Sequence, residues 1–150
     1  MGCGSILPTP YTLHNLRRFA YILQPKKLPK ILAIDDDSIF LELLIEWLSV
    51  NEFDAIVAAS GRQGLELAQT QLPDLIICDI RMPGVDGYQV LTALRQNPVT
   101  QNIPLIFLTS ENKEYHAIRA QELGANACLN KFYLGEELRR VIQEQLSFNI

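Results

Sequence analysis

Hydrophobic and polar positions follow two different periods along this chain. From Lys30 onward, five short apolar runs alternate with longer segments whose apolar residues recur at helical spacing. Runs without polar interruption are typical of parallel strands, because helices cover such strands on both faces. The predicted strands are Ile31–Ile34, Ala55–Ala58, Leu75–Cys78, Leu105–Leu108 and Ala125–Leu129.

The segments between and after these runs predict helices. In residues 40–48 and 134–146, apolar side chains recur three and four positions apart, which places them on one face of a helix. One helix should begin after the capping residue Ser60, and another should begin at Asp86 or Gly87. The helix predicted at 111–123 should stop at Gly124. Five strands alternating with five helices predict an α/β fold in three layers, with one parallel sheet between helices.

The first 29 residues differ from the rest in composition. They contain four prolines, and Leu13, Leu16, Ala20 and Leu23 have helical spacing beside Arg17 and Arg18. A short amphipathic helix and a frayed extension are both consistent with this pattern, because short isolated helices are marginal in water. We therefore expect an N-terminal extension at 1–29 and one globular domain at 30–150.

Charge and cysteine content limit the function classes. The 150 residues carry a net charge of -4, but residues 1–30 carry +5 and the remainder -9. An acidic body argues against direct nucleic-acid binding, which depends on Lys and Arg. No apolar run approaches the roughly 20 residues that span a bilayer, so no membrane partner is expected. The three cysteines are scattered, which favours a reducing cytoplasm over a disulfide framework.

Polar residues with chemical potential follow the predicted strands directly. In a parallel sheet the carboxyl ends of the strands meet at one edge, and ligands usually bind there. The residues that follow the first, third, fourth and fifth runs at this edge are Asp35, Asp36, Asp37, Asp79, Thr109, Ser110, Asn130 and Lys131. One edge of the sheet should thus gather carboxylates, hydroxyls and an ammonium group.

The carboxylates in this set predict a cation site. Asp37 or Ser38 can cap the following helix, which leaves Asp35 and Asp36 beside Asp79. Two carboxylates about 4 Å apart repel by roughly 4 kcal/mol at an effective dielectric of 20, so the cluster needs a cation or protons. Mg²⁺ suits a site with few carboxylates and retained water.

Asp79 could then act as a nucleophile toward phosphorus, because a nearby metal offsets the charge that accumulates during the attack. Lys131 could pair with phosphoryl oxygens, and the Thr109 hydroxyl could donate a hydrogen bond to another of them.

Residues 30–147 resemble the receiver domain of response regulators. The most specific stretch is residues 73–87, which contain the pattern Asp-x-x-Met-Pro-x-x-Asp-Gly that is the phosphoacceptor signature of that family. Residues 31–37, 103–110 and 124–131 also match. The resemblance implies a flavodoxin-like fold with five strands in the order 2-1-3-4-5.

The resemblance also implies a role for each site residue. Asp79 would be the phosphorylated residue, Asp36 a direct Mg²⁺ ligand and Asp35 a ligand through water. The backbone carbonyl of Arg81 would supply a further metal contact, and Thr109 and Lys131 would bind the phosphoryl group. Such a domain is a phosphoacceptor rather than an enzyme with a separate substrate, apart from self-catalysed phosphotransfer and autodephosphorylation.

Two departures from the family pattern concern the fifth strand. Phe132 follows Lys131 where the family usually has proline, often with a cis bond. Cys128 occupies the position of the family's switch aromatic, so rotation of that aromatic cannot be the output here. Arg81 and Glu111 each lie two residues after a site residue, and we hypothesise that they pair across the approach to the phosphoryl group and slow attack by water.

The expected partners follow from the resemblance. A sensor histidine kinase or a histidine phosphotransfer protein would supply the phosphoryl group, and a stand-alone receiver would signal by docking to a downstream protein. The face formed by the fourth helix, fifth strand and fifth helix is the expected docking or homodimer surface. The main alternative is an interaction module that lacks phosphotransfer. A phosphatase of the haloacid dehalogenase type is a weaker one, since Arg81 stands where that class has a second acid.

Overall fold

A computed structural model describes residues 10–147. Residues 1–9, which form part of the predicted extension, and residues 148–150 lie outside the described part of the chain. Five parallel strands form one sheet in the order β2-β1-β3-β4-β5, which confirms the predicted fold. The strands are β1 (Lys30–Ile34), β2 (Asp54–Ala58), β3 (Leu75–Cys78), β4 (Leu105–Thr109) and β5 (Ala127–Asn130).

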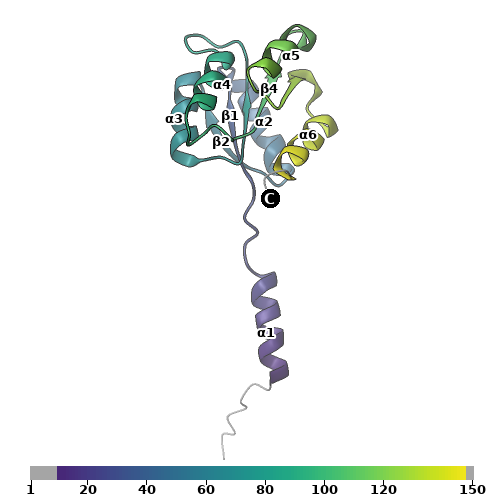
Figure 1. The fold of residues 1–150 in the computed structure, drawn as a ribbon. Helices are drawn as coiled ribbons and strands as arrows, with labels where there is room; N and C mark the ends of the chain where they lie inside the picture. Colours follow the sequence, from purple (N-terminus) through teal and green to yellow (C-terminus); the bar gives the residue numbers. More distant parts are fainter. Residues whose placement is uncertain (1–9, 148–150) are drawn as a thin grey trace, which may run out of the picture.

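Helices cover both faces of this sheet and give the body three layers (Figure 1). In the described part they are α1 (Pro10–Ile22), α2 (Ser38–Val50), α3 (Gly61–Gln71), α4 (Gly87–Gln96), α5 (Lys113–Glu122), the short 3-10 helix η1 (Lys131–Tyr133) and α6 (Glu136–Ser147).

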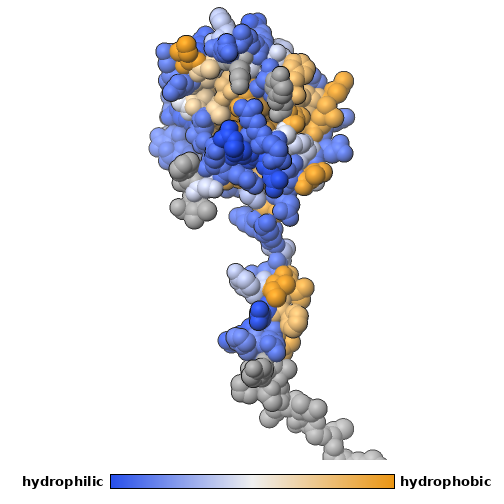
Figure 2. Space-filling view, turned by 90° about the vertical axis from the view of Figure 1, so that its right-hand side faces the viewer, coloured by the Kyte–Doolittle hydropathy of each residue, from blue (hydrophilic) through white to orange (hydrophobic). Residues whose placement is uncertain are grey.

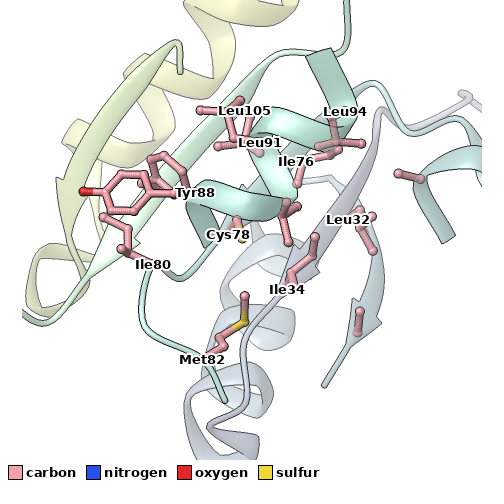
Figure 3. Packing of buried hydrophobic residues seen from close by; sticks show 14 of the residues in the cluster. Leu32, Ile34, Ile76, Cys78, Ile80, Met82, Tyr88, Leu91, Leu94 and Leu105 are labelled. Carbon is pink, nitrogen blue, oxygen red and sulfur yellow. The ribbon is translucent and has the colours of Figure 1, made fainter. Parts of the chain in front are cut away.

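The sheet separates two hydrophobic cores. Helices α2 and α6 bury leucine, valine and isoleucine against one face of the sheet. The other core lies between the sheet and helices α3, α4 and α5, with Leu32, Ile34 and Ile76 from the sheet and Leu91 and Leu94 from α4 (Figure 3). Because both faces are covered, β1, β3 and β4 are buried over most of their length, which explains their continuous apolar sequence.

Capping residues set the helix starts at the edge where the strands end. Asp37 accepts hydrogen bonds from the backbone N–H groups of Ile39 and Phe40 at the start of α2. Asp86 and Gln89 form a reciprocal capping box at the start of α4. These contacts satisfy N–H groups that the first helical turn leaves without partners.

Two predicted boundaries near the fifth strand were wrong. Helix α5 begins at Lys113 rather than Glu111, because the Asn112 side chain accepts a hydrogen bond from the Glu114 N–H and caps the helix there. Strand β5 begins at Ala127 rather than Ala125. The Ala125 N–H donates back to the Ala120 carbonyl of the helix end, across Gly124 at a φ of +93°.

Helix α1 lies apart from the body, joined to β1 by an extended segment (Figure 1). Its apolar side chains gather on one side and its polar ones on the other (Figure 2). Leu13, Leu16 and Phe19 are each at least half exposed. Of the two alternatives for this segment, the structure has the helix. No helix among residues 10–147 is both long and apolar enough to cross a membrane.

Candidate functional site

Three carboxylates meet at the carboxyl edge of the sheet. Asp35 follows β1 and Asp79 follows β3, which are adjacent strands paired at Ile34 and Cys78. Carboxylate oxygens of Asp35, Asp36 and Asp79 all lie within 4.8 Å of one another. Asp35 and Asp79 are buried, with 2% and 8% of their surface exposed, whereas Asp36 is exposed. This donor set of clustered oxygens suits a hard divalent cation.

Backbone N–H groups orient the two buried carboxylates. The Asp37 N–H donates to Asp35 Oδ1 over 3.0 Å, and the Ile80 N–H donates to Asp79 Oδ1 over 2.8 Å. The Oδ2 atoms of Asp35 and Asp79 both approach the ammonium group of Lys131. Each carboxylate thus has one oxygen held by the backbone and one directed at the shared site.

Lys131 is the cation of the site. Its Nζ lies 2.6 Å from Asp35 Oδ2 and 3.3 Å from Asp79 Oδ2, and 4.6 Å from the centre of the Phe40 ring. Burial alone would lower the pKa of Lys131, but the hydrogen bond to Asp35 and the charge of Asp79 raise it. Lys131 therefore remains charged and offsets part of the negative charge of the cluster.

The two buried acids are shifted toward their protonated forms. Burial, with the neighbouring charge of Asp35, raises the pKa of Asp79 to about 6, although Lys131 works in the opposite direction. Burial also raises the pKa of Asp35. Without a further cation, a second negative charge in this site is costly. The residues therefore fit a bound divalent cation, which would offset that charge.

Thr109 ends β4 beside this cluster and is 1% exposed. Its Oγ1 accepts a hydrogen bond from the Glu111 N–H over 3.1 Å, which leaves the hydroxyl hydrogen for another acceptor. Arg81 lies two residues beyond Asp79, and its side chain is 73% exposed.

Strand β5 lacks the aromatic residue that is usual in the family, and the loop after it lacks the usual proline. The Lys131–Phe132 peptide bond is trans, and the Phe132 N–H donates to Asn130 Oδ1. The Phe132 side chain is exposed, and Cys128 is partly buried on β5. Despite both departures, Lys131 reaches Asp35 and Asp79.

Sequence reasoning missed two residues near the site. It assigned no role to Tyr88 or His116, yet His116 hydrogen-bonds to both Glu111 and Tyr88. Tyr88 packs edge-on against Phe107 in the core, and its hydroxyl points away from that cluster (Figure 3). The only sequence signal was the presence of a histidine on the buried side of an otherwise polar helix. Glu111 is also bound to Arg81, as the hypothesis of a pair required.

Comparison with known proteins identifies the family. The sequence model of the response regulator receiver domain matches residues 31–143. The chain belongs to this family. The transcriptional regulatory protein CpxR of Escherichia coli is 39% identical over 109 residues, which are 73% of this chain and 45% of CpxR. The regulatory protein PhoP of Bacillus subtilis is 34% identical over 109 residues, with the same coverage. The receiver domain described here spans about half the length of the curated relatives it matches.

Solved receiver structures have the same fold. The chemotaxis protein CheY4 of Vibrio cholerae superimposes with a TM-score of 0.73 at 28% identity, over 79% of this chain and 98% of CheY4. A receiver domain protein of Clostridium thermocellum gives 0.76 at 27% identity, over 81% and 97% of the two chains. The chain is therefore a receiver domain of two-component signalling.

Proposed function

We propose that this receiver domain accepts a phosphoryl group on Asp79 from a phosphohistidine of a sensor kinase or phosphotransfer protein. The observation that carries the proposal is the juxtaposition of Asp79 with Asp35, Asp36 and Lys131 in one partly buried site. An oxygen of Asp79 would form a bond to phosphorus while the phosphorus–nitrogen bond breaks. The imidazole nitrogen would leave with the electron pair.

A Mg²⁺ ion fits the acidic side of this site. Asp36 and Asp79 would be direct ligands, Asp35 a ligand through water, and the Arg81 carbonyl a further ligand. The ion would supply electrostatic stabilisation for the added phosphoryl oxygens. The exposure of Asp36 and the raised pKa of Asp79 support a site that gains from a cation.

Lys131 and Thr109 would bind the phosphoryl group once it is attached. Lys131 can move its contact from Asp35 and Asp79 to a phosphoryl oxygen, because the ammonium group has three donors. Thr109 has a hydroxyl hydrogen to donate to a second oxygen. These contacts exist only in the phosphorylated form, so they would shift the population between two conformations of the domain.

The signal would leave through protein contacts at α5, β5 and α6. Tyr115 and Ile118 on α5 are 78% and 70% exposed, so this otherwise polar helix presents two large hydrophobic side chains to solvent. A downstream protein or a second copy of the receiver could cover them. Autodephosphorylation at Asp79 would then end the signal.

Intact mass of the full chain after treatment with a small phosphodonor tests the proposal. We expect one added phosphoryl group that requires both Mg²⁺ and Asp79, with Asp79→Asn taking up none. Asp36→Asn should reduce the uptake strongly, because it removes a metal ligand. A folded protein that gains no mass at any reaction time would instead favour an interaction module without phosphotransfer.

A further inference from the structure

A chain of hydrogen bonds runs from the loop after β3 to helix α4, beside the site. Arg81 Nε contacts Glu111 Oε1, and Glu111 Oε2 lies 2.6 Å from His116 Nε2. On the other side of the ring, His116 Nδ1 lies 2.6 Å from the Tyr88 hydroxyl. The four side chains come from two short stretches of the chain, residues 81–88 and 111–116, each of which contributes one loop residue and one helix residue.

The chemistry of Glu111 fixes the direction of its bond to His116, and in the neutral ring it thereby fixes the bond to Tyr88. A carboxylate can only accept, so His116 Nε2 carries the hydrogen and donates to Glu111. In a neutral imidazole Nδ1 is then the acceptor, and the Tyr88 hydroxyl donates to it. A single tautomer of His116 therefore satisfies both neighbours, and no polar atom of this buried ring is left without a partner.

His116 reduces the freedom of Glu111 and so makes the Arg81–Glu111 ion pair easier to form. An isolated surface ion pair contributes little, because both long side chains must be ordered to form it. Arg81 is 73% exposed, but Glu111 is held from the inner side by His116, whose side chain is 5% exposed. The hydrogen bond from His116 is also the largest reason that the pKa of Glu111 is lowered. The contact with His116 thus restrains Glu111 independently of Arg81.

The ordered Glu111 connects the two loops that flank Asp79. Its backbone N–H donates to Thr109 Oγ1, and its carboxylate holds Arg81, which is two residues after Asp79. A water molecule that attacks a phosphoryl group on Asp79 must approach from the outer side of this edge. The ion pair joins the two loops at this edge, where it would narrow that approach.

We propose that His116 is a positioning residue that holds Glu111 against Arg81 and thereby slows the loss of the phosphoryl group from Asp79. The inference rests on the proposed function. In the reaction that is slowed, a water oxygen bonds to phosphorus and the bond between phosphorus and Asp79 breaks. Asp79 leaves as a carboxylate, and inorganic phosphate and a proton enter the solvent.

Two substitutions of His116 separate the two bonds of its ring. His116→Gln places an amide N–H near the position of Nε2 and keeps a donor for Glu111. His116→Asn places its amide near Nδ1, so it keeps a partner for Tyr88 but cannot reach Glu111. The chain's other histidine, the exposed His14 on α1, offers the matched control His14→Asn.

The measurement is the first-order loss of the phosphoryl group in Mg²⁺, followed by intact mass after the donor is removed. We expect His116→Asn to lose it about two- to fivefold faster, the range that one restrained surface pair can supply. His116→Gln and His14→Asn should match the wild-type rate. Glu111→Ala should be as fast as His116→Asn, and the double variant no faster than Glu111→Ala alone, because both act through Glu111.

Nitrogen-15 relaxation of the Arg81 Nε–H tests the ion pair between Arg81 and Glu111 in the unphosphorylated protein. The group should be ordered in the wild type and in His116→Gln, and mobile in His116→Asn and Glu111→Ala. Equal phosphoryl lifetimes in the wild type and His116→Asn would overturn the inference while leaving phosphorylation of Asp79 intact. A double variant that loses the phosphoryl group clearly faster than Glu111→Ala would also overturn it, because the two substitutions would then act independently. If neither the wild type nor any of these variants accepts the phosphoryl group, the proposed function is wrong, and this inference is wrong with it.

Discussion

Burial and neighbouring charge both oppose ionisation of the Asp79 carboxyl group. Its carboxylate shares the site with Asp35 and is only partly compensated by Lys131, so its pKa is about 6 instead of the ordinary 3.8. A raised pKa means that the folded protein holds the proton more tightly than the unfolded chain does. The charge that makes Asp79 a nucleophile is therefore a cost to folding.

The cost has a defined pH window. It is absent below pH 3.8, grows as the pH rises, and is complete above about pH 6. In metal-free protein, we expect Asp79→Asn to increase the free energy of unfolding at pH 7 by about 1–3 kcal/mol, because the amide carries no charge. Urea unfolding in a chelator measures this difference, which should shrink toward pH 4.

A matched control is Asp54→Asn, since Asp54 is an exposed acid on the edge strand β2. This variant should change stability by less than about 0.5 kcal/mol. Equal or lower stability of Asp79→Asn at pH 7 would show that the site does not strain the folded protein.

Residue roles divide into those that sequence could predict and those that it could not. Asp35 and Asp79 each follow a strand, Thr109 ends one, and Lys131 follows β5. Parallel strands end at one edge, so the meeting of these residues follows from the topology. His116 contacts Tyr88, 28 positions away, across the packing of α5 against α4. No local pattern encodes that contact, because it depends on where two helices lie on the sheet.

At the scale of elements, helix α4 connects the nucleophile to the core. Its first residue, Gly87, donates its N–H to the Ile80 carbonyl over 2.8 Å, so the helix begins against the end of β3. A Cβ atom on Gly87 would lie 2.2 Å from the Asp79 carbonyl oxygen and 2.8 Å from Ile80 Cα. This close approach of backbone to backbone requires glycine.

We therefore expect Gly87→Ala to destabilise the domain by about 1–3 kcal/mol, the usual cost of forcing extra volume into a packed site. It should also slow phosphorylation, because the helix can move away only by shifting the chain at Asp79. Gly135→Ala is the control, since nothing lies within 4 Å of its added Cβ. Thermal unfolding of both variants measures the difference, and equal midpoints would contradict the steric argument.

Elements differed in how far sequence could predict them. Strand β3 begins and ends where its apolar run does, because both of its faces are covered. Helix α5 begins two residues late because the Asn112 side chain supplies the cap, which leaves Glu111 outside the helix and beside the site. Several residues in that segment could cap a helix, so the choice among them is made by tertiary contacts.

At the scale of the whole molecule, α1 contrasts with the acidic body. It presents an exposed apolar side and an opposite polar side, and it lies away from the sheet and its helices (Figure 2). Its sequence includes Arg17 and Arg18. A contact between the linker and the body is the surface pair of Lys26 with Glu52, 3.6 Å apart. Such exposed pairs contribute little to stability.

Removal of residues 1–25 should therefore leave the folding of the receiver unchanged. We expect the free energy of unfolding in urea to stay within about 0.5 kcal/mol of the full chain, since none of the described residues in this segment, 10–25, belongs to either hydrophobic core. Phosphorylation of Asp79 should continue at the same rate. A clear loss of stability would mean that α1 packs on the body in solution.

The central claim is that Asp79 itself carries the phosphoryl group, and mapping the modified residue tests it most directly. Borohydride reduces an aspartyl phosphate to homoserine, which remains in place through digestion and can be located by peptide mass spectrometry. After phosphodonor and Mg²⁺ treatment, we expect homoserine at position 79 alone, and none in the Asp79→Asn variant. Homoserine at position 35 or 36, or modification that persists in Asp79→Asn, would contradict it.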